Sequence, residues 1–394
     1  MNIAILGYGT VGTGVDKILK NNKRIFVTRI LEKASRIDGD KRKTSSIEDI
    51  IDDTSIDGVV ETMGGIDTAY DYISRAMRAG KFVVTANKAV VAAYYKELHE
   101  LAKECNVKFA YEASVGGVLP IIHMIHSINR YEDILEVGGI LNGTSNYILD
   151  TMTKDKLPFT VALRQAQEAG YAESDPSADI DGIDVKNKLM ILSSLAFKQV
   201  SEYDKIKVTG IRNITKEDID YFTKQGAVCR LFALAKRNDD TYTSVIEPVL
   251  FDGNSVFANV SLNNNAAFVY SRSSGQIVVH GQGAGQLPTG HAVVQDIVDI
   301  YEGVSKEFEN LSKYTYIDED KETMYYVRTN ADMNKYIEYT ECIGELAYYV
   351  KVDTRSKWDN ILTDILSQDS RTFYARYDEE CWKAIKSSGV KVND

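Results

Sequence analysis

Short apolar runs alternate with amphipathic stretches along the first third of the chain. Apolar residues recur at helical spacing at about 13–20, 67–79 and 90–105. The apolar runs between them have the length of buried strands and lie at 2–6, 26–31, 57–61, 81–85 and 107–111. Strands that alternate with helices predict a doubly wound parallel sheet, so we assign a first α/β domain to residues 1–130.

The middle of the chain combines the two patterns in another order. Helical spacing predicts helices at 146–154, 160–169, 181–197 and 215–224, with an irregular acidic loop over 171–180. Strand patterns fall at 136–141, 227–236, 241–250, 267–271 and 276–280. We therefore predict an α+β domain at 131–284, with a mixed open sheet whose free face can form a subunit interface.

Two later stretches complete the expected architecture. The glycine-rich loop 281–289, which includes Gly285, opens a helix, and we expect the segment 285–315 to return to the first domain beside a bound cofactor. In the tail, 320–394, we predict strands at 324–328, 347–352 and 372–377. A helix between them has apolar residues on one face, namely Trp358, Ile361, Leu362, Ile365 and Leu366. The tail is thus expected to be a small α+β segment.

Composition narrows the classes of function. The formal charge of the 394 residues is −11, which argues against nucleic acid or an anionic membrane as partner. The four cysteines are far apart and form no CxxC pair, which is typical of reduced thiols in a cytoplasm. The N-terminus has the pattern of a strand rather than a signal peptide, and no run approaches the ~18 apolar residues of a membrane span. His123 and His126 lack further ligands for a metal site.

A GxGxxG motif, Gly7-Tyr8-Gly9-Thr10-Val11-Gly12, follows the first predicted strand and precedes a helix. Gly7 permits the tight turn, Gly9 lets the backbone approach a pyrophosphate, and Gly12 lets helix and strand pack closely. The first helical turn, with Thr10 and Val11, supplies N–H groups and a positive dipole end. This context predicts a dinucleotide site in a Rossmann-type domain.

The end of the second predicted strand bears on the choice between NAD and NADP. Glu32 can bind the ribose hydroxyls, whereas Lys33, Ser35 and Arg36 can hold a 2′-phosphate. The basic cluster tilts the prediction towards NADP, although a solvated charged turn would have the same composition.

Polar loops follow further strands, at the edge of the sheet where ligands bind. Thr62 and Gly64 come after one strand, and Asn87 and Lys88 after the next. By position alone, Lys88 is as well explained by a surface role as by a functional one.

A glycine-rich turn, 112–120, follows the last strand of the first domain. Its carbonyl groups and the Glu112 carboxylate are the oxygen ligands that a hard cation prefers. Composition alone favours the simpler interpretation, a flexible crossing into the next domain.

An acidic run ends in lysines within the second domain. Between 173 and 188 it contains Glu173, Asp175, Asp179, Asp181, Asp184, Lys186 and Lys188. Asp184 and Lys188 are four residues apart on a predicted helix and share a face, which in the simplest case makes a weak surface ion pair. Clustered carboxylates also suit a ligand with an ammonium group, and a lysine can donate a proton to a carbonyl oxygen.

These stretches together resemble homoserine dehydrogenases. The matching motifs are GYGTVG (7–12), TANKAVV (85–91), EASVGGVLPII (112–122), GILNGTSNYIL (139–149), GYAESDPSADIDGID (170–184) and GQGAGQLPT (281–289). The resemblance covers roughly residues 1–310, and its most specific motif is Gly170–Lys188. It implies reversible NAD(P)H-dependent reduction of L-aspartate 4-semialdehyde to L-homoserine, on the route to threonine and methionine, by a homodimer or a dimer of dimers.

The resemblance also assigns roles to residues of this chain. Glu173 and Asp184 match acidic residues that position the substrate, with Glu173 at its ammonium group, and Lys88 and Lys188 match lysines that bind substrate and deliver the proton. Substrate contacts are expected at Thr144, Tyr171 and Asp179. Glu112 with the carbonyls of Val115, Gly117 and Leu119 matches a Na⁺ site, which reverses the interpretation from composition. We expect Lys188 to be the donor because Asp184 can orient it.

The tail is similar in place and pattern to the regulatory ACT domain of many family members. It is short and lacks a Pro-Gly turn at Asp353–Ser356, so we expect an ACT-like segment with altered or lost amino-acid sensing. Two alternatives are a related amino-acid dehydrogenase with another small substrate and a cofactor-binding regulator without turnover. The set Glu173, Asp184, Lys188 and Lys88 argues against the regulator, because a sensor needs no paired lysines and carboxylates.

Overall fold

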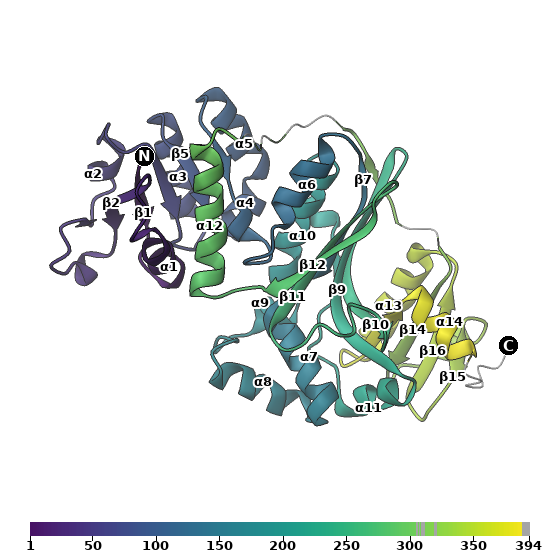
Figure 1. Ribbon diagram of the computed structural model, residues 1–394. Helices are drawn as coiled ribbons and strands as arrows, with labels where there is room; N and C mark the ends of the chain where they lie inside the picture. The colour runs from purple at the N-terminus through teal and green to yellow at the C-terminus, as the bar shows by residue number, and fades with distance from the viewer. Residues whose placement is uncertain (305, 307, 309–311, 319–320, 388–394) are drawn as a thin grey trace. The chain divides into compact units, whose positions relative to one another are not determined.

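The computed structural model (Figure 1) describes residues 1–304, 306, 308, 312–318 and 321–387. These residues fall into two compact units. The first comprises Met1–Val137, Asn187–Tyr203 and Ala267–Lys313, and the second comprises Gly138–Lys186, Asp204–Ala266 and Tyr314–Asp394. Among the described helices, none is both long and apolar enough to cross a membrane.

A parallel sheet with the order β3-β2-β1-β4-β5-β6 forms the centre of the first unit. Its strands are β1 (Asn2–Leu6), β2 (Phe26–Leu31), β3 (Lys43–Thr44), β4 (Gly58–Glu61), β5 (Phe82–Thr85) and β6 (Phe109–Ala110). This order confirms the predicted doubly wound sheet. The strand order runs outward from β1 to β3 on one side and from β4 to β6 on the other, so it reverses between β1 and β4, which is where such sheets bind ligands. The predicted strand 107–111 is wrong in length, because only Phe109–Ala110 pairs with β5.

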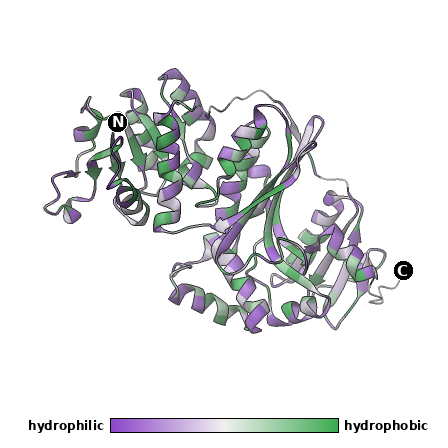
Figure 2. Ribbon diagram, viewed as in Figure 1, coloured by the Kyte–Doolittle hydropathy of each residue, from purple (hydrophilic) through white to green (hydrophobic). Residues whose placement is uncertain are grey.

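Helices connect these strands as α1 (Thr10–Leu19), α2 (Glu48–Ile51), α3 (Asp67–Arg78), α4 (Lys88–Ala93), α5 (Tyr95–Glu104) and α6 (Ile121–Asn129). They combine hydrophilic and hydrophobic residues, as amphipathic helices do (Figure 2). The single helix predicted at 90–105 is wrong: the chain leaves helical geometry at Tyr94 (φ −123°, ψ 32°), between α4 and α5.

The later helix α12 (Gln286–Tyr301) packs on α1 in the same unit. The helices approach closely because both contact surfaces contain glycine. A Cβ atom at Gly14 would lie 2.1 Å from the Gln286 carbonyl oxygen, and one at Gly290 would lie 2.9 Å from the Gly14 carbonyl carbon. Val293 and Ile297 of α12 belong to the core cluster formed with strand residues such as Ile5.

The second unit contains α7 (Gly143–Asp155), α8 (Phe159–Glu168), α9 (Ser177–Ile180), α11 (Lys216–Lys224), β8 (Lys207–Val208), β9 (Ala227–Asn238) and β10 (Thr241–Asp252). Strands β9 and β10 form a long antiparallel hairpin. Other elements are β7 (Ile134–Ile140), α10 (Ile183–Ala196), β11 (Asn264–Ser271) and β12 (Gly275–Gln282). These strands confirm the mixed sheet. The segment 171–180, predicted to be wholly irregular, ends in the short helix α9.

The tail adds strands β17-β14-β16-β15 to this sheet, and β17 pairs in parallel with β10. Its elements are β13 (Thr315–Tyr316), β14 (Thr323–Arg328), β15 (Thr340–Cys342), β16 (Ala347–Val352), α13 (Arg355–Gln368), β17 (Phe373–Tyr377) and α14 (Glu379–Ser387). Trp358, Ile361 and Ile365 are buried against the sheet as predicted, whereas Leu366 is exposed. A βαββαβ unit needs a helix between β14 and β15, and that connection holds only the 3₁₀ turn Asn334–Tyr336. The ACT-like assignment stays a prediction.

Candidate active site

The glycine motif forms a tight turn between β1 and α1. Gly7 has φ +93°, and a Cβ atom there would lie 2.9 Å from the Met63 Cα, so other residues would be strained at this position. A Cβ at Gly12 would lie 2.2 Å from the Gly7 carbonyl oxygen, whereas one at Gly9 meets no atom within 4 Å. Helix α1 begins at Thr10, inside the motif, so the N–H groups of Thr10 and Val11 lie in its first turn. This open helix N-terminus fits a pyrophosphate.

The loops after β4 and β5 are tied to this turn and to each other. The Thr62 hydroxyl donates to the Gly7 carbonyl oxygen at 2.7 Å. Gly64 and Gly65 follow with φ of +78° and +77°. The Asn87 amide donates to the Gly65 carbonyl at 2.6 Å, and its oxygen accepts from Ala89 and Val90 to cap α4. Lys88, the first residue of α4, directly follows this cap, whose amide is bonded to the loop after β4.

The turn after β2 brings the Glu32 side chain to the backbone of Lys33 and to the side chain of Arg36. The Glu32 carboxylate accepts from the Lys33 N–H at 2.9 Å and lies 3.9 Å from the Arg36 guanidinium. The Glu32 side chain is 7% exposed and that of Arg36 is 64% exposed. The acid is therefore already engaged within its own turn, while Arg36 faces solvent.

Asn142 holds two of the predicted substrate residues in the second unit. It is 4% exposed and caps α7, accepting from the Ser145 N–H at 2.8 Å. Its side-chain nitrogen donates to Asp179 at 2.7 Å and to Asp184 at 2.9 Å. Both amide hydrogens are thus used to bring together two carboxylates from different elements. The polar turn 142–146 has residues that can cap the helix after it, but no pattern in the sequence indicated this second role for Asn142.

Other predicted substrate residues lie on the same loops. The Thr144 hydroxyl, from the first turn of α7, donates to the Tyr171 carbonyl at 2.6 Å. Tyr171 is 41% exposed and its ring lies 5.1 Å from that of Tyr147. The side chain of Glu173 is exposed, and its carbonyl oxygen accepts from the Gln167 amide at 3.0 Å.

Helix α10 carries the acidic and basic pair predicted from the sequence. Asp184 is 6% exposed and Lys188 is 7% exposed, so the bland interpretation of a surface ion pair is wrong. The two residues are one turn apart on a continuous helix and therefore project from one face. A buried charge is costly unless it is paired and hydrogen-bonded, so the burial of Asp184 and Lys188 requires that each has partners in a defined geometry.

The Glu112 turn has oxygen donors of the kind that a hard cation binds. The Glu112 carboxylate is buried and accepts from the backbone N–H groups of Ile122 (2.9 Å) and His123 (2.8 Å), at the start of α6. Val115 and Leu119 flank it, and Gly117 (φ +60°) turns the backbone between them. In the described residues no cluster of three or more His, Cys, Asp or Glu can hold a metal ion. A cation here would therefore depend on carbonyl oxygens, which Na⁺ accepts.

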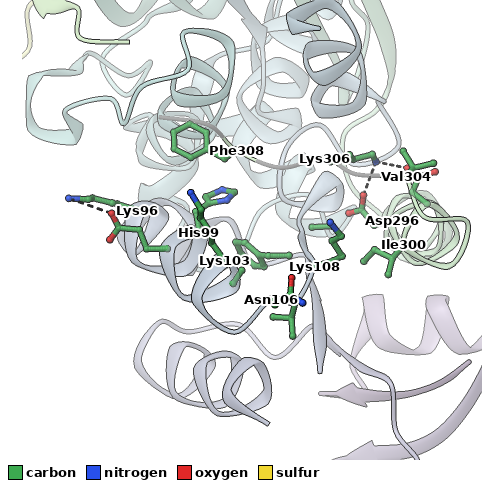
Figure 3. A pocket seen from close by; sticks show the side chains of 16 residues that line it. Lys96, His99, Lys103, Asn106, Lys108, Asp296, Ile300, Val304, Lys306 and Phe308 are labelled. Atoms are coloured by element: carbon green, nitrogen blue, oxygen red, sulfur yellow. Dashed lines mark hydrogen bonds and ion pairs between the residues drawn. The ribbon is translucent and has the colours of Figure 1, made fainter. Parts of the chain in front are cut away.

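An acidic cluster that includes the Glu112 carboxylate holds Lys306 next to this turn. The Lys306 ammonium lies 2.6 Å from Asp299, 3.1 Å from Asp296 and 3.8 Å from the Glu112 carboxylate. Burial raises the pKa of Glu112 and of Asp296 above their usual values, and Lys306 opposes this effect. A cavity of about 450 Å³ opens beside Lys306, between α5, β6 and the end of α12 (Figure 3). Its described lining includes none of the predicted site residues.

Comparison with known proteins decides the family. Residues 7–112 match the family model described as homoserine dehydrogenase, NAD binding domain, and residues 120–298 match that described as homoserine dehydrogenase. A homoserine dehydrogenase of Bacillus subtilis is 35% identical over 315 residues, which are 76% of this chain and 72% of the relative.

The chain belongs to the homoserine dehydrogenase family.

Solved homoserine dehydrogenase structures share the fold. That from Thiobacillus denitrificans has a TM-score of 0.85 and 30% identity, over 96% of this chain and 98% of the other. A hyperthermophilic archaeal homoserine dehydrogenase in complex with NADPH has a TM-score of 0.67 and 26% identity, over 78% of this chain and 99% of the other. The chain is accordingly an NAD(P)-dependent oxidoreductase with homoserine dehydrogenase activity, which interconverts L-aspartate 4-semialdehyde and L-homoserine.

Within this homoserine dehydrogenase, the predicted site residues divide between the two units. All the predicted cofactor residues, including Gly285 at the start of α12, and the Glu112 turn belong to the first unit. Thr144, Tyr171, Glu173, Asp179 and Asp184 belong to the second unit, and α10 continues from Asp184 to Lys188 in the first. Sequence reasoning missed Asn142 and Gly14. An asparagine between a strand and a helix signalled a cap, but nothing local signalled its two distant carboxylates.

Proposed function

We propose that Lys188 donates the proton in the reduction of the aldehyde and that Asp184 orients it. The observation that carries this proposal is the Asn142 amide, which fixes the Asp184 carboxylate at 2.9 Å, one helical turn before Lys188. A lysine buried on such a helix face loses rotamer freedom before the reaction begins. Its ammonium group is then preorganised for a developing negative charge.

The other residues of the acidic stretch bind the substrate in this proposal. Glu173 is exposed and holds the substrate ammonium group by charge. Asp179, which shares the Asn142 amide with Asp184, adds a second acceptor. Thr144 and Tyr171 also contact the substrate. The hydroxyl of Thr144 donates to the carbonyl of Tyr171, which holds the two residues together.

Reduction of the aldehyde adds one hydride to carbon and one proton to oxygen. A nicotinamide cofactor held at the glycine turn would supply the hydride for the aldehyde carbon. As the carbonyl oxygen gains negative charge, the Lys188 ammonium neutralises it and transfers one proton to it, leaving a neutral amine. Lys88, at the start of α4, binds the substrate and provides a second positive charge.

We further propose that NADP is preferred over NAD. Glu32 is bonded to the adjacent Lys33 N–H, and Arg36 is largely exposed, so a 2′-phosphate can pair with Lys33 and Arg36. Arg36→Ala should raise the KM for NADPH about tenfold or more and leave that for NADH nearly unchanged. Equal effects on both cofactors would show that Arg36 does not recognise the 2′-phosphate.

We also propose a structural Na⁺ ion at the Glu112 turn. Glu112 and the carbonyl oxygens of Val115, Gly117 and Leu119 would hold it, and the ion would stiffen the start of α6. Replacing Na⁺ by a bulky organic cation should lower the thermal midpoint of the wild-type protein and have little effect on Glu112→Gln. An unchanged thermal midpoint of the wild-type protein would show that no Na⁺ ion stabilises this turn.

The domain boundaries and the assembly of the protein are also proposed. We propose a cofactor domain at 1–130 completed by 285–315, a catalytic and dimerisation domain at 131–284, and an ACT-like segment at 320–394. A homodimer or dimer of dimers, built on the mixed sheet, and a cytoplasmic location complete the proposal. Light scattering on the purified protein tests the assembly directly, since a monomer at all concentrations would contradict it.

Steady-state kinetics of paired variants test the catalytic roles. Asp184→Asn and Lys188→Ala should each lower kcat by about 10²-fold or more, with the dissociation constant of NADPH within about twofold of the wild-type value. Lys186→Ala, two residues earlier on α10, is the matched control and should stay near wild-type. Near-normal turnover of Lys188→Ala would move the donor role to Lys88 or to water.

A further inference from the structure

Glu61 is a buried carboxylate at the point where the parallel sheet reverses its strand order. It is the last residue of β4 and is 0% exposed. Its backbone pairs with Leu6, just before the glycine turn, on one side and with Thr85 of β5 on the other. This charge has no part in the chemistry proposed above.

One carboxylate oxygen of Glu61 holds the loop that follows β4. Oε1 accepts a hydrogen bond of 2.7 Å from the Met63 N–H. Met63 is the residue whose Cα limits the space over Gly7, and its neighbour Thr62 donates to the Gly7 carbonyl. The Glu61 side chain therefore sets the position of the backbone that packs on the cofactor turn.

The other oxygen leads to Lys88. Oε2 accepts from the Thr85 hydroxyl at 2.5 Å, and the oxygen of that hydroxyl accepts from the Asn87 N–H at 3.0 Å. Asn87 then caps α4, which begins at Lys88, and bonds back to Gly65. The chain of bonds thus joins both loops through one side chain.

An ionised carboxylate accepts at both oxygens of residue 61, one from the Met63 N–H and the other from the Thr85 hydroxyl. An amide at this position would present a hydrogen either to the Met63 N–H, which can only donate, or to the Thr85 hydroxyl, which would then have to turn its own hydrogen away. Burial raises the pKa of Glu61, whereas its bonds from Thr85 and Met63 favour the ionised form. Burial of a carboxylate costs free energy, so its retention here needs a compensating role.

We propose that Glu61 is a positioning residue that couples the cofactor turn to Lys88 through Met63 on one side and Thr85 on the other. The inference rests on the proposed function, because it takes Lys88 to act on the substrate. Loss of Glu61 disturbs both cofactor binding and turnover. Loss of the Thr85 hydroxyl disturbs only the hydrogen bonds that connect Glu61 to Asn87 and the start of α4 at Lys88.

Three variants separate these effects. Thr85→Val keeps the bond from Met63 and should lower kcat about tenfold to a hundredfold, with the NADPH dissociation constant within about twofold of wild-type. Glu61→Gln should lower kcat by a similar factor and also raise that dissociation constant severalfold. Thr28→Val is the control: its hydroxyl donates at 3.4 Å to Ile3 within the same sheet, away from the loops, and kinetics should not change.

Circular dichroism and thermal midpoints first establish that each variant is folded at the assay temperature. Folded Glu61→Gln with wild-type kcat and wild-type NADPH binding would overturn the proposal. A Glu61→Gln variant in which only kcat falls would also overturn it, because the bond from Met63 to Glu61 would then have no effect on NADPH binding. Lys88→Ala is assayed alongside: full activity there would contradict the role of Lys88, while the NADPH dissociation constant of Glu61→Gln would still decide the role of Glu61.

Discussion

Asn142 donates a hydrogen bond of 2.9 Å to Asp184, forty-two residues further along the chain. The same nitrogen donates to Asp179 at 2.7 Å, so a single neutral amide separates two carboxylates that would otherwise repel each other. This arrangement holds the carboxylates of Asp179 and Asp184 in fixed positions relative to Asn142.

Replacement of Asn142 by aspartate tests that arrangement. The substitution Asn142→Asp keeps a good helix cap but puts a third carboxylate against the first two. We expect kcat/KM for homoserine to fall at least about a hundredfold, with NADPH binding retained. Asn142→Ala, which loses the cap but adds no charge, should lose less activity and about 1 kcal/mol of stability. Wild-type kinetics for Asn142→Asp would contradict the bridging role.

A methyl group at Gly14 tests the contact between α1 and α12. The added Cβ would lie 2.1 Å from the Gln286 carbonyl oxygen, a backbone atom that cannot move aside easily. Gly14→Ala should lower the free energy of unfolding by about 1–3 kcal/mol and weaken NADPH binding. Gly39→Ala is the matched control, because a Cβ there meets no atom within 4 Å. Equal denaturation midpoints for the two variants would count against this packing.

The buried His99 predicts how stability depends on pH. Burial lowers the pKa of His99 to about 3 from an ordinary value of 6.5, and its ring nitrogen lies 2.9 Å from the Tyr111 hydroxyl oxygen. The unfolded chain therefore binds the proton more readily, so this contribution is present above pH 6.5 and is lost as the pH falls towards 3. Between pH 7 and pH 5 the loss is about 2 kcal/mol.

Urea denaturation at both pH values measures this loss. The free energy of unfolding of His99→Phe should fall less between pH 7 and pH 5 than that of the wild-type protein. Burial also lowers the pKa of His126, to about 4, so part of the wild-type dependence should remain in the variant. The same pH dependence in both proteins would show that His99 titrates normally.

Local patterns in the sequence were enough to predict much of the first unit. The turn at Gly7 and the helix after it depend on neighbours within the motif, and the shared face of Asp184 and Lys188 depends only on helical spacing. The break of the helix at Tyr94 was not predicted, because the helical spacing of apolar residues continues through it; in the structure the Tyr94 ring stacks on the Tyr70 ring, with centroids 3.9 Å apart.

Long-range contacts explain what the sequence left open. Asn142 meets Asp179 and Asp184 across more than thirty residues that include helices α7 and α8, and Glu61 meets Thr85 through strand pairing. A single sequence does not show such pairs. The helix α14 was not predicted; it is nine residues long, and Cys381 and Ile385 are its buried residues.

We propose that Lys188 transfers the proton while the glycine turn holds the cofactor. Stopped-flow measurement of a single turnover, with aspartate semialdehyde mixed into enzyme saturated with NADPH, tests this most directly. We predict that hydride transfer in Lys188→Ala is slower by about 10²- to 10⁴-fold, with NADPH affinity unchanged and Lys186→Ala near wild-type. A hydride-transfer rate for Lys188→Ala within a few-fold of the wild-type rate would contradict it.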